Sequence, residues 1–355
     1  MTACPERLAL CALVEEDGDP DPRGFTSAMT RPRIVITDCD HGTIAIEQEI
    51  LGDLAQIELH QRNDEAALLT LCLDADGIIT QYGAFTRRVL QALRRCRVIS
   101  RYGVGVDTID LAAATERGII VAFVPDYGTD EVSNHAAALI LALHRRVLPL
   151  DRGVRTGHWD FRLGTPIQRL TKQTLGVIGL GRIGTALAAK MRAFGLAVIA
   201  ADPYRTEWPS WVRRVPLDEL LQVSDTISLH CPLTAETRHL INATALRKMK
   251  PTAILVNTAR GGVVDTEAVL QALRERWIAG AALDVQEAEP MPATHPLAGL
   301  DNVILTPHAA WYSEDSVVEC KRKTALAVRR VLEGQIPAAV ANPDVLKHPP
   351  WIRPP

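Results

Sequence analysis

The stretch TLGVIGLGRIGTALAAKMRAFG, residues 174 to 195, carries the pattern that decides the fold of this chain. Gly179, Gly181 and Gly184 form the spacing G-x-G-x-x-G between an apolar strand pattern and the start of a helical one. In such a unit the first glycine permits a tight turn, the second lets backbone N–H groups approach a pyrophosphate, and the third lets helix and strand pack closely. The stretch therefore predicts a dinucleotide-binding unit of strand, loop and helix.

An acidic residue follows this unit at the distance that a ribose contact requires. Asp202 ends the next apolar segment, AVIAAD, where a carboxylate can accept hydrogen bonds from an adenosine ribose. The alternative, in which the glycines serve only a tight turn, does not explain why strand, helix and acid are all in register. Because a carboxylate would repel a 2′-phosphate, we expect NAD rather than NADP. Arg205 lies close by in the sequence and leaves the strictness of this preference open.

Apolar strand patterns extend the fold in both directions from this unit. Six of them, at 174–180, 196–202, 225–231, 252–258, 280–285 and 302–308, are joined by helical patterns or short loops. Five more precede them, at 33–37, 56–60, 76–80, 97–100 and 118–122. Continuous apolar strands that alternate with helices are typical of parallel sheets covered on both faces. The expected fold class is therefore α/β, with two doubly wound parallel-sheet domains, the first flavodoxin-like and the second of the Rossmann type.

Two longer helical patterns connect and close these sheets. Residues 131–154 are expected to form one long apolar helix, which can serve as a hinge between the two α/β units. Residues 313–333 are expected to form a last helix that ends at Gly334, a usual helix C-cap, and that can return to the first sheet. Residues 1–30 are expected to be a disordered extension, and residues 343–355 an irregular tail.

Composition limits the classes of partner. The 355 residues are 47% hydrophobic and 23% charged, a balance that indicates a globular protein rather than a disordered or a membrane protein. The formal net charge is −3 and no basic face is long enough to neutralise a nucleic-acid backbone, so we expect a small-molecule partner. The seven cysteines are widely spaced and include no C-x-x-C pair. They indicate neither a disulfide framework nor a metal site, and they favour a reducing cytoplasm.

Three residues that follow apolar strands of the second sheet have side chains suited to hydride-transfer chemistry: Arg260, Glu289 and His308. Doubly wound sheets bind their ligands at the carboxyl ends of the strands. A histidine can exchange the proton of a substrate hydroxyl, and the planar fork of an arginine can orient an anionic substrate. Taken singly, a surface arginine, a solvated carboxylate and a structural histidine are the more common findings. Periodicity does not show that the three meet in space.

A second glycine-containing stretch, RYGVGVDTIDL at 101–111, lacks the third glycine that a phosphate loop needs. One interpretation is a turn from strand to helix with Asp107 as the helix cap. The other is a patch of backbone amides, from Gly103 to Gly105, that faces a substrate carboxylate. The residues alone leave both interpretations open.

Several motifs in the right order resemble a known family. The segments LVNTARGGVVD, GAALDVQEAEP and NVILTPHAAWYSE closely resemble the D-isomer-specific 2-hydroxyacid dehydrogenases. The segments HAAWYSE, VPDYGTDEVSNHA and HCPL are similar to those of the C-terminal binding protein branch of that family. The resemblance covers about residues 31–342. It implies a substrate-binding domain of residues 31–130 and 312–342 around a Rossmann NAD-binding domain of residues 131–311, with a homodimer formed through the Rossmann domains.

The resemblance also implies roles for individual residues. Arg260 would orient the substrate anion, Glu289 would be the acid that precedes a proline, and His308 would be the proton donor and acceptor. The substrate-binding residues carried over by motif are Arg101, Gly103, Val104, Gly105, Arg260 and Trp311. The cofactor-binding residues, with those of the glycine loop, are Val104, Gly179, Gly181, Arg182, Ile183, Gly184, Asp202, Cys231, Thr237, Thr258, Ala259, Asp284 and His308.

The expected function is that of an NAD-dependent oxidoreductase acting on a small anionic substrate, a 2-hydroxy or 2-oxo acid, with D-stereospecificity by resemblance. A dehydrogenase of hydroxyalkyl phosphonates and a corepressor-like peptide-binding protein that responds to NAD are the alternatives. Gln286 stands where the family often has an aromatic residue, and Tyr82 lies in a loop that differs among members. Both departures leave the size of the substrate open.

Overall fold

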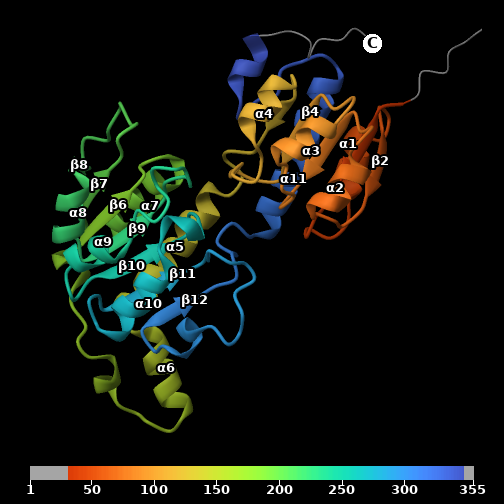
Figure 1. Ribbon diagram of the computed structural model, residues 1–355. Coiled ribbons are helices and arrows are strands. Elements are labelled where there is room, and N and C mark those ends of the chain that lie inside the picture. The colour runs from red at the N-terminus through yellow and green to blue at the C-terminus, as the bar shows by residue number, and fades with distance from the viewer. Residues whose placement is uncertain (1–30, 348–355) are drawn as a thin grey trace, which may run out of the picture. The chain divides into compact units, whose positions relative to one another are not determined.

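Two parallel β-sheets organise residues 31–347, the part of the chain that the computed structural model describes (Figure 1). The first sheet has five strands in the order β2-β1-β3-β4-β5, and all its pairings are parallel. Its strands are β1 (Arg33–Ile36), β2 (Gln56–Leu59), β3 (Gly77–Thr80), β4 (Val98–Arg101) and β5 (Ile120–Ala122). This is the flavodoxin-like order that the sequence predicts.

The helices of this first part cover both faces of the sheet, and three of the four shorter ones begin at polar caps. Its shorter helices are α1 (Ala45–Leu51), α2 (Glu65–Leu71), α3 (Arg87–Ala92) and α4 (Leu111–Glu116). The side chains of Asp64, Thr86 and Asp110 accept the backbone N–H three residues further on, which starts α2, α3 and α4. The cap of α4 is therefore Asp110, and the interpretation of Asp107 as the cap is wrong.

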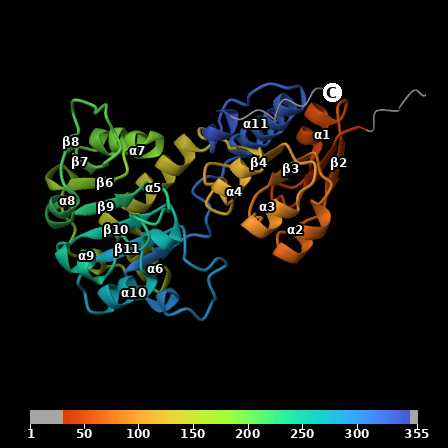
Figure 2. The ribbon, with the colours of Figure 1, turned by 45° about the horizontal axis from the view of Figure 1, so that its top comes forward.

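The long helix α11 (Glu314–Leu332) returns to the five-stranded sheet from the far end of the chain. With α1 it covers one face of the sheet, and α2, α3 and α4 cover the other (Figure 2). Ser313 caps its start, and Gly334 follows its end in a left-handed conformation with φ 76°. The Nζ atom of Lys321 lies 3.0 Å from Glu47 Oε1, and this buried ion pair joins α11 to α1.

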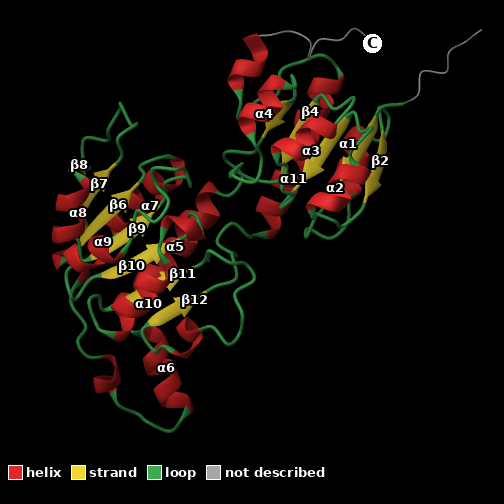
Figure 3. Ribbon diagram, in the orientation of Figure 1, coloured by secondary structure: helices red, strands yellow, loops and turns green. Residues whose placement is uncertain are grey.

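The second sheet has seven strands in the order β12-β11-β10-β9-β6-β7-β8, again all parallel (Figure 3). Its strands are β6 (Thr174–Ile178), β7 (Ala197–Ala201), β8 (Arg213–Arg214), β9 (Thr226–Leu229), β10 (Ile254–Asn257), β11 (Gly280–Leu283) and β12 (Val303–Leu305). The order in which strands are added reverses between β6 and β9, as at the switch point of a Rossmann sheet. The sequence predicts six of these strands. It misses β8, whose two exposed arginines carry no apolar pattern.

Helices cover both faces of this sheet too. They are α5 (Thr129–His144), α7 (Arg182–Ala193), α8 (Leu217–Val223), α9 (Ala243–Lys248) and α10 (Thr266–Arg274). The first two pack on one face, and α8, α9 and α10 pack on the other. Burial of apolar strands on both faces explains why their sequences are continuously apolar rather than alternating.

The expected single helix at 131–154 is divided into two. The helix α5 ends at His144, and α6 (Val147–Arg155) begins after Arg146, which adopts a left-handed conformation with φ 53°. A non-glycine residue in that conformation breaks the ladder of helical hydrogen bonds. The apolar spacing continues across the break, so periodicity did not reveal it.

Outside the two sheets, residues 343–347 form a short 3-10 helix, η5 (Pro343–Lys347), in which Val345 is buried. The expectation of an irregular tail is therefore wrong for these residues. The remaining tail residues 348–355 and the expected extension 1–30 lie outside the described residues. Among the helices of residues 31–347, none has the length and apolar character needed to cross a membrane. The expected boundaries of the two domains stay a prediction.

Candidate active site

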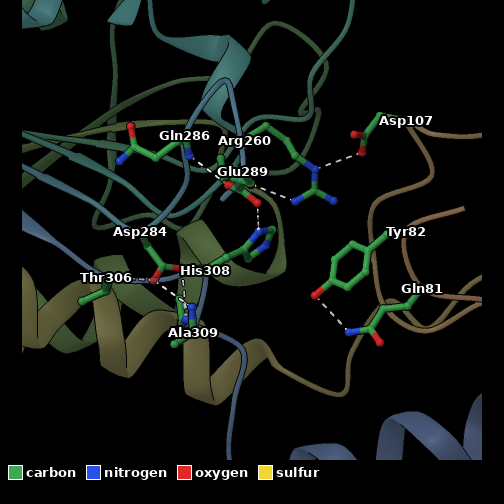
Figure 4. Close-up of polar contacts among 12 residues, drawn as sticks. Gln81, Tyr82, Asp107, Arg260, Asp284, Gln286, Glu289, Thr306, His308 and Ala309 are labelled. Atoms are coloured by element: carbon green, nitrogen blue, oxygen red, sulfur yellow. Dashed lines mark hydrogen bonds and ion pairs between the residues drawn. The ribbon is translucent and has the colours of Figure 1, made fainter. Parts of the chain in front are cut away.

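The strand β12 delivers His308 to the carboxyl edge of the second sheet. After Thr306 and Pro307 the backbone of His308 turns into the left-handed region with φ 54°. This turn brings the Nδ1 atom of the imidazole to 2.7 Å from Glu289 Oε2 (Figure 4). The second carboxylate oxygen of Glu289 accepts the backbone N–H of Gln286 at 2.8 Å, so both oxygens of the acid are held.

The carboxylate of Asp284, at the end of β11, fixes the loop that carries His308. It is 1% exposed. It accepts hydrogen bonds from Thr306 Oγ1 at 2.6 Å and from the backbone N–H groups of Ala309 and Ala310 at 2.9 and 3.0 Å (Figure 4). The backbone carbonyl of Asp284 also accepts the N–H of His308 at 2.8 Å. These bonds hold the left-handed turn in place, because each donor would otherwise be left without a partner.

The helix α5 contacts the same loop through His135. Its Nε2 atom lies 3.1 Å from Thr306 Oγ1 and 3.6 Å from Asp284 Oδ1. Thr306 donates its hydroxyl proton to Asp284, so it can accept from His135 at the same time. A chain of hydrogen bonds therefore runs from α5 to the loop of His308.

The ionisation of Glu289 follows from its partners. Burial by itself raises the pKa of this carboxyl group, but the hydrogen bond and the charge of His308 outweigh it and bring the pKa of Glu289 below its usual value. Glu289 is therefore a charged carboxylate at neutral pH. This carboxylate lies 2.7 Å from the imidazole of His308 and fixes the orientation of the ring.

Arg260 follows β10 in a turn that Asn257 shapes. The Asn257 side chain donates to Arg260 O at 2.9 Å and accepts from Ala259 N at 3.0 Å. The guanidinium of Arg260 donates from Nε to Asp107 Oδ1 at 2.9 Å and from Nη1 to Ala259 O at 2.8 Å (Figure 4). Burial alone raises the pKa of Asp107, but the charge of Arg260 and its hydrogen bond bring it below its usual value. Asp107 thus acts as the anchor of Arg260.

The glycines of RYGVGVD make room for two guanidinium groups. A Cβ atom at Gly105 would lie 1.4 Å from Arg260 Nη2, and one at Gly103 would lie 1.9 Å from Arg101 Nη1. Neither position tolerates a side chain while the arginines keep their places. Burial lowers the pKa of Arg101, and the nearby charge of Arg260 lowers it further. Within residues 31–347, no carboxylate lies within ion-pair distance of the Arg101 guanidinium.

The glycine loop leaves space where a pyrophosphate needs it. Gly179 has φ 87°, and a Cβ atom there would lie 2.6 Å from Cys231 N in the neighbouring loop. A Cβ atom at Gly184 would lie 2.2 Å from Gly179 O, so this glycine permits the close approach of helix and strand. A Cβ atom at Gly181 would meet nothing within 4 Å. The open space thus lies at the start of α7, whose N–H groups suit an anion.

Asp202 braces the glycine loop in addition to its expected role. Its Oδ2 atom accepts the N–H of Leu180 at 2.8 Å, and Oδ1 accepts that of Tyr204 at 3.0 Å. Each oxygen keeps a lone pair for a ribose hydroxyl. Arg205 donates to the carbonyl of Leu180 and, at 3.1 Å, to Thr185 Oγ1. Its guanidinium is therefore engaged by the loop itself.

The comparisons with known proteins decide the family. Residues 137–310 match the family model of the D-isomer-specific 2-hydroxyacid dehydrogenase NAD-binding domain. A glyoxylate reductase of Thermofilum pendens is 45% identical over 340 residues, which are 90% of this chain and 97% of that one. The chain belongs to the D-isomer-specific 2-hydroxyacid dehydrogenase family. It is an NAD-dependent dehydrogenase that acts on the CH–OH group of its donor.

Solved structures of other dehydrogenases have the same fold. The D-lactate dehydrogenase of Aquifex aeolicus, complexed with NAD and lactic acid, is 32% identical with a TM-score of 0.81 and covers 87% of this chain and 99% of that one. Another solved structure is that of the NADPH-dependent glyoxylate/hydroxypyruvate reductase of Sinorhizobium meliloti in complex with NADP and malonate. It is 29% identical with a TM-score of 0.79, and the match covers 88% of this chain and 97% of that one. These relatives do not single out the C-terminal binding protein branch, which stays a prediction.

A cleft of about 580 Å³ brings most of the expected site residues of this dehydrogenase together. Those that line it are Arg101, Val104, Gly105, Gly181, Arg182, Ile183, Cys231, Thr258, Ala259, Arg260, Asp284, His308 and Trp311. The Thr258 hydroxyl is buried there and, among residues 31–347, has no hydrogen-bond partner. An unpaired buried hydroxyl and the open space at Gly181 both fit a bound dinucleotide.

Six expected residues lie outside the cleft lining and support it instead: Gly103, Gly179, Gly184, Asp202, Thr237 and Glu289. Glu289 contacts the cleft through His308. Thr237 folds the loop after Cys231, because its hydroxyl donates to Pro232 O at 2.6 Å and accepts from Thr234 N at 2.7 Å. Motif matching predicts such positions without showing whether they touch a ligand or a neighbouring loop.

The cleft of the dehydrogenase also contains residues that we did not name as site residues. They are His41, Gln81, Tyr82, Tyr102, Asp107, Phe123, Tyr127 and His230, among others. His41 and Tyr127 pack on Trp311, with ring centroids 5.1 and 6.3 Å apart, and form an aromatic wall with it. Burial lowers the pKa of His41 to about 4, so this imidazole is neutral. The sequence contained a signal for these positions, because several of them directly follow the carboxyl ends of strands of the first sheet, where doubly wound sheets bind their ligands.

The described residues give no indication of a metal centre. Residues 31–347 contain no group of three or more His, Cys, Asp or Glu side chains that could hold a metal ion. The carboxylates at and near the cleft are instead engaged in hydrogen bonds, Glu289 with His308 and Asp107 with Arg260.

Proposed function

We propose that this dehydrogenase interconverts a small 2-oxo acid and the D-2-hydroxy acid, with His308 as acid and base, Glu289 as its partner and Arg260 as the substrate-orienting residue. The observation that supports this most is the 2.7 Å contact between His308 Nδ1 and Glu289 Oε2, at the cleft that His308 shares with Arg260. Because Glu289 engages Nδ1, Nε2 is the ring nitrogen left to face a substrate.

The pairing of His308 with Glu289 determines the path of the proton between the enzyme and the substrate. When NADH is bound in the cleft, it supplies the hydride. In the reducing direction, protonated His308 donates the Nε2 proton to the carbonyl oxygen of the substrate as the carbonyl carbon is reduced. In the oxidising direction, neutral His308 accepts the hydroxyl proton. Glu289 stabilises the imidazolium in both directions and keeps the ring oriented.

The substrate anion would be held by the two arginines. Asp107 and Ala259 O occupy one N–H on Nε and one on Nη1 of Arg260, so the N–H groups of Nη2 remain for a carboxylate. Arg101, which has no ion pair within residues 31–347, supplies a second guanidinium in the same cleft. A partly buried cation without an ion pair is costly, and an anionic substrate would reduce that cost.

Two alternative functions share parts of this site. A hydroxyalkyl phosphonate carries a doubly charged anion, and the presence of two guanidinium groups favours it as a second candidate substrate. A peptide-binding corepressor of the C-terminal binding protein type would need no catalytic pair, and the His308–Glu289 contact therefore argues for an enzyme.

An assay of NADH consumption against a panel of short 2-oxo acids and acyl phosphonates tests the proposal. We expect turnover of at least one 2-oxo acid and formation of the D-hydroxy product, as resolved by chiral chromatography. Turnover of phosphonates alone would select the alternative substrate. Binding of NADH without turnover of any panel member would contradict the enzymatic proposal.

We also propose that the dehydrogenase is a homodimer in the cytoplasm. The helix α6 has no buried residue, and the segment after it exposes Trp159 to 88% and Phe161 to 79%. Apolar side chains gathered on one segment are typical of a surface that binds a partner. The free thiols of Cys39, Cys72, Cys96, Cys231 and Cys320 support a reducing compartment.

A further inference from the structure

Side chains hold the loop that carries Glu289. This loop, residues 286–291, follows the buried Val285, and within residues 31–347 it takes part in no backbone–backbone hydrogen bond. One polar anchor is Glu289 itself, whose carboxylate accepts the N–H of Gln286 and contacts His308 (Figure 4). The other polar anchor is the carboxylate of Glu287. The position of Glu289 therefore depends on side-chain contacts at two points of the loop.

Glu287 belongs to a second histidine–glutamate pair. Its Oε1 atom lies 2.6 Å from His239 Nε2. Its Oε2 atom accepts the backbone N–H of Thr266, the first residue of α10, at 2.9 Å. Both oxygens of this carboxylate are thus engaged. Glu287 ties the loop to His239 and α10, whereas Glu289 ties the same loop to His308.

The turn that follows Arg260 in turn holds His239. This turn is the 3-10 helix η3 (Gly261–Val263). The backbone N–H of His239 donates to Gly262 O at 2.9 Å. The backbone of His239 has φ 51°, a left-handed conformation that a non-glycine residue keeps only where its surroundings impose it. His239 therefore links the loop of Glu289 to the turn of Arg260.

The loop of Glu289 also packs closely on this turn. A Cβ atom at Gly261 would lie 1.9 Å from the carbonyl carbon and oxygen of Gln286 and 2.4 Å from Glu287 N. The residue after Arg260 must therefore be a glycine for the loop to pass where it does. The contact between His239 and Glu287 lies beside this crossing and keeps the two segments together.

The pair is charged but contributes little to the stability of the whole fold. Burial alone raises the pKa of Glu287, but its hydrogen bonds with Thr266 and His239 outweigh burial and bring the pKa below its usual value. The side chains of His239 and Glu287 are 41% and 31% exposed. Ion pairs with this exposure stabilise a protein only weakly. The effect of the pair is therefore local, on the loop that it anchors.

We propose that His239 and Glu287 are positioning residues for the reaction and that their contact keeps Glu289 within reach of His308. Neither of them lines the cleft, so their effect passes through Glu289. This inference rests on the proposed function, in which Glu289 and His308 form the catalytic pair. It adds a second histidine–glutamate pair through which the first keeps its geometry.

A steady-state assay of NADH with glyoxylate, the smallest 2-oxo acid, tests this role in His239→Ala. We expect kcat to fall by about 5- to 20-fold, because a displaced partner misorients the catalytic group, and KM for glyoxylate to stay within about threefold. His239→Gln should restore kcat to within about threefold of the unmodified enzyme, since its amide can still donate to Glu287. An unchanged kcat in His239→Ala, or no recovery in His239→Gln, would overturn the inference.

His60→Ala is the matched control. His60 Nε2 lies 3.2 Å from Glu58 Oε2, their side chains are 27% and 28% exposed, and neither residue lines the cleft. Loss of this pair should change kcat by no more than about twofold, because exposed ion pairs contribute little. A fall in kcat like that of His239→Ala would mean that any such pair supports turnover.

The background of Glu289→Gln shows whether the effect passes through Glu289. With Glu289 replaced, His239→Ala should lower kcat by no more than about twofold further, because residues that act through one another are not additive. An equal loss in both backgrounds would mean that His239 supports the enzyme by another route and would overturn the inference.

The imidazole NMR signal of His308, assigned by its loss in His308→Ala, reports the same contact without turnover. We expect His239→Ala to move this signal towards its position in Glu289→Gln, and His60→Ala to leave it in place. An unmoved signal in His239→Ala would contradict the positioning role. If the unmodified enzyme reduces neither glyoxylate nor another 2-oxo acid, the proposed function fails, while the NMR signal still decides whether the second pair positions Glu289.

Discussion

His308 adopts a left-handed backbone conformation that few non-glycine residues accept, and this conformation orients its ring towards Glu289. The buried carboxylate of Asp284 accepts hydrogen bonds from the backbone after His308, and these bonds offset the conformational cost of the left-handed turn. The unusual conformation thus belongs to the residue for which we propose the acid–base role, and such conformations are common at active sites. Among the individual residues, the site is a His308–Glu289 pair whose loop a buried acid holds in place.

The pair predicts a change in pH dependence for Glu289→Gln. The low pKa of Glu289 means that its charge is present at neutral pH and is lost only as the pH falls through that lowered value. Glu289→Gln removes this titrating carboxylate and leaves His308 Nδ1 with a neutral partner. The acid limb that follows the lowered pKa of Glu289 should therefore disappear from the pH profile of kcat, and kcat at neutral pH should fall by about 10- to 100-fold. A pH profile of kcat measures both effects, and an unchanged acid limb would show that turnover does not depend on the charge of Glu289.

At the scale of elements, the loops at the carboxyl ends of β10, β11 and β12 form one hydrogen-bonded unit. Asp284, at the end of β11, accepts three donors from the residues that follow β12. Glu289, further along the loop after β11, contacts His308 after β12. Adjacent parallel strands thus combine short loops into a site that none of them could form alone.

This unit predicts that Asp284→Ala destabilises the fold in the absence of cofactor. The change leaves Thr306 Oγ1 and two backbone N–H groups without their acceptor, and the free energy of unfolding should fall by about 2–4 kcal/mol. Asp301→Ala is the control, because the Asp301 side chain is 89% exposed and, within residues 31–347, pairs only with Arg152. This control should change the free energy of unfolding by no more than about 0.5 kcal/mol. Urea denaturation measures the free energy of unfolding of both variants. If Asp284→Ala were as stable as the unmodified enzyme, the role of Asp284 would be restricted to cofactor binding.

Much of this arrangement is predictable from the sequence, because it depends on local pattern. The spacing of Gly179, Gly181 and Gly184 predicts the start of α7, and apolar strands predict both sheets. The break at Arg146 is not predictable, since the apolar period continues through it. The Arg260–Asp107 bond joins residues 153 positions apart, and no spacing rule reports such a contact. Motifs thus predict candidate catalytic residues, whereas tertiary contacts decide which partners orient them.

At the scale of the whole molecule, the proposed dimer gives α6 and the segment after it a role. The paired change of Trp159→Ser and Phe161→Ser should shift the enzyme from twice the chain mass to the chain mass in light scattering, because it removes two exposed apolar anchors. Tyr204→Ser is the control, since Tyr204 is 83% exposed on the segment after β7. A dimer that survives the paired change would place the interface elsewhere, and a monomeric unmodified enzyme would contradict the proposal.

We propose that His308 transfers a proton and does not merely support the cofactor site. The most direct measurement is the single-turnover reduction of a responding 2-oxo acid by His308→Ala, together with its NADH affinity. We predict that turnover falls by about 10²- to 10⁴-fold, as loss of a general acid does, while the NADH dissociation constant stays within about threefold. Turnover close to that of the unmodified enzyme, or a large loss of NADH binding, would contradict the claim.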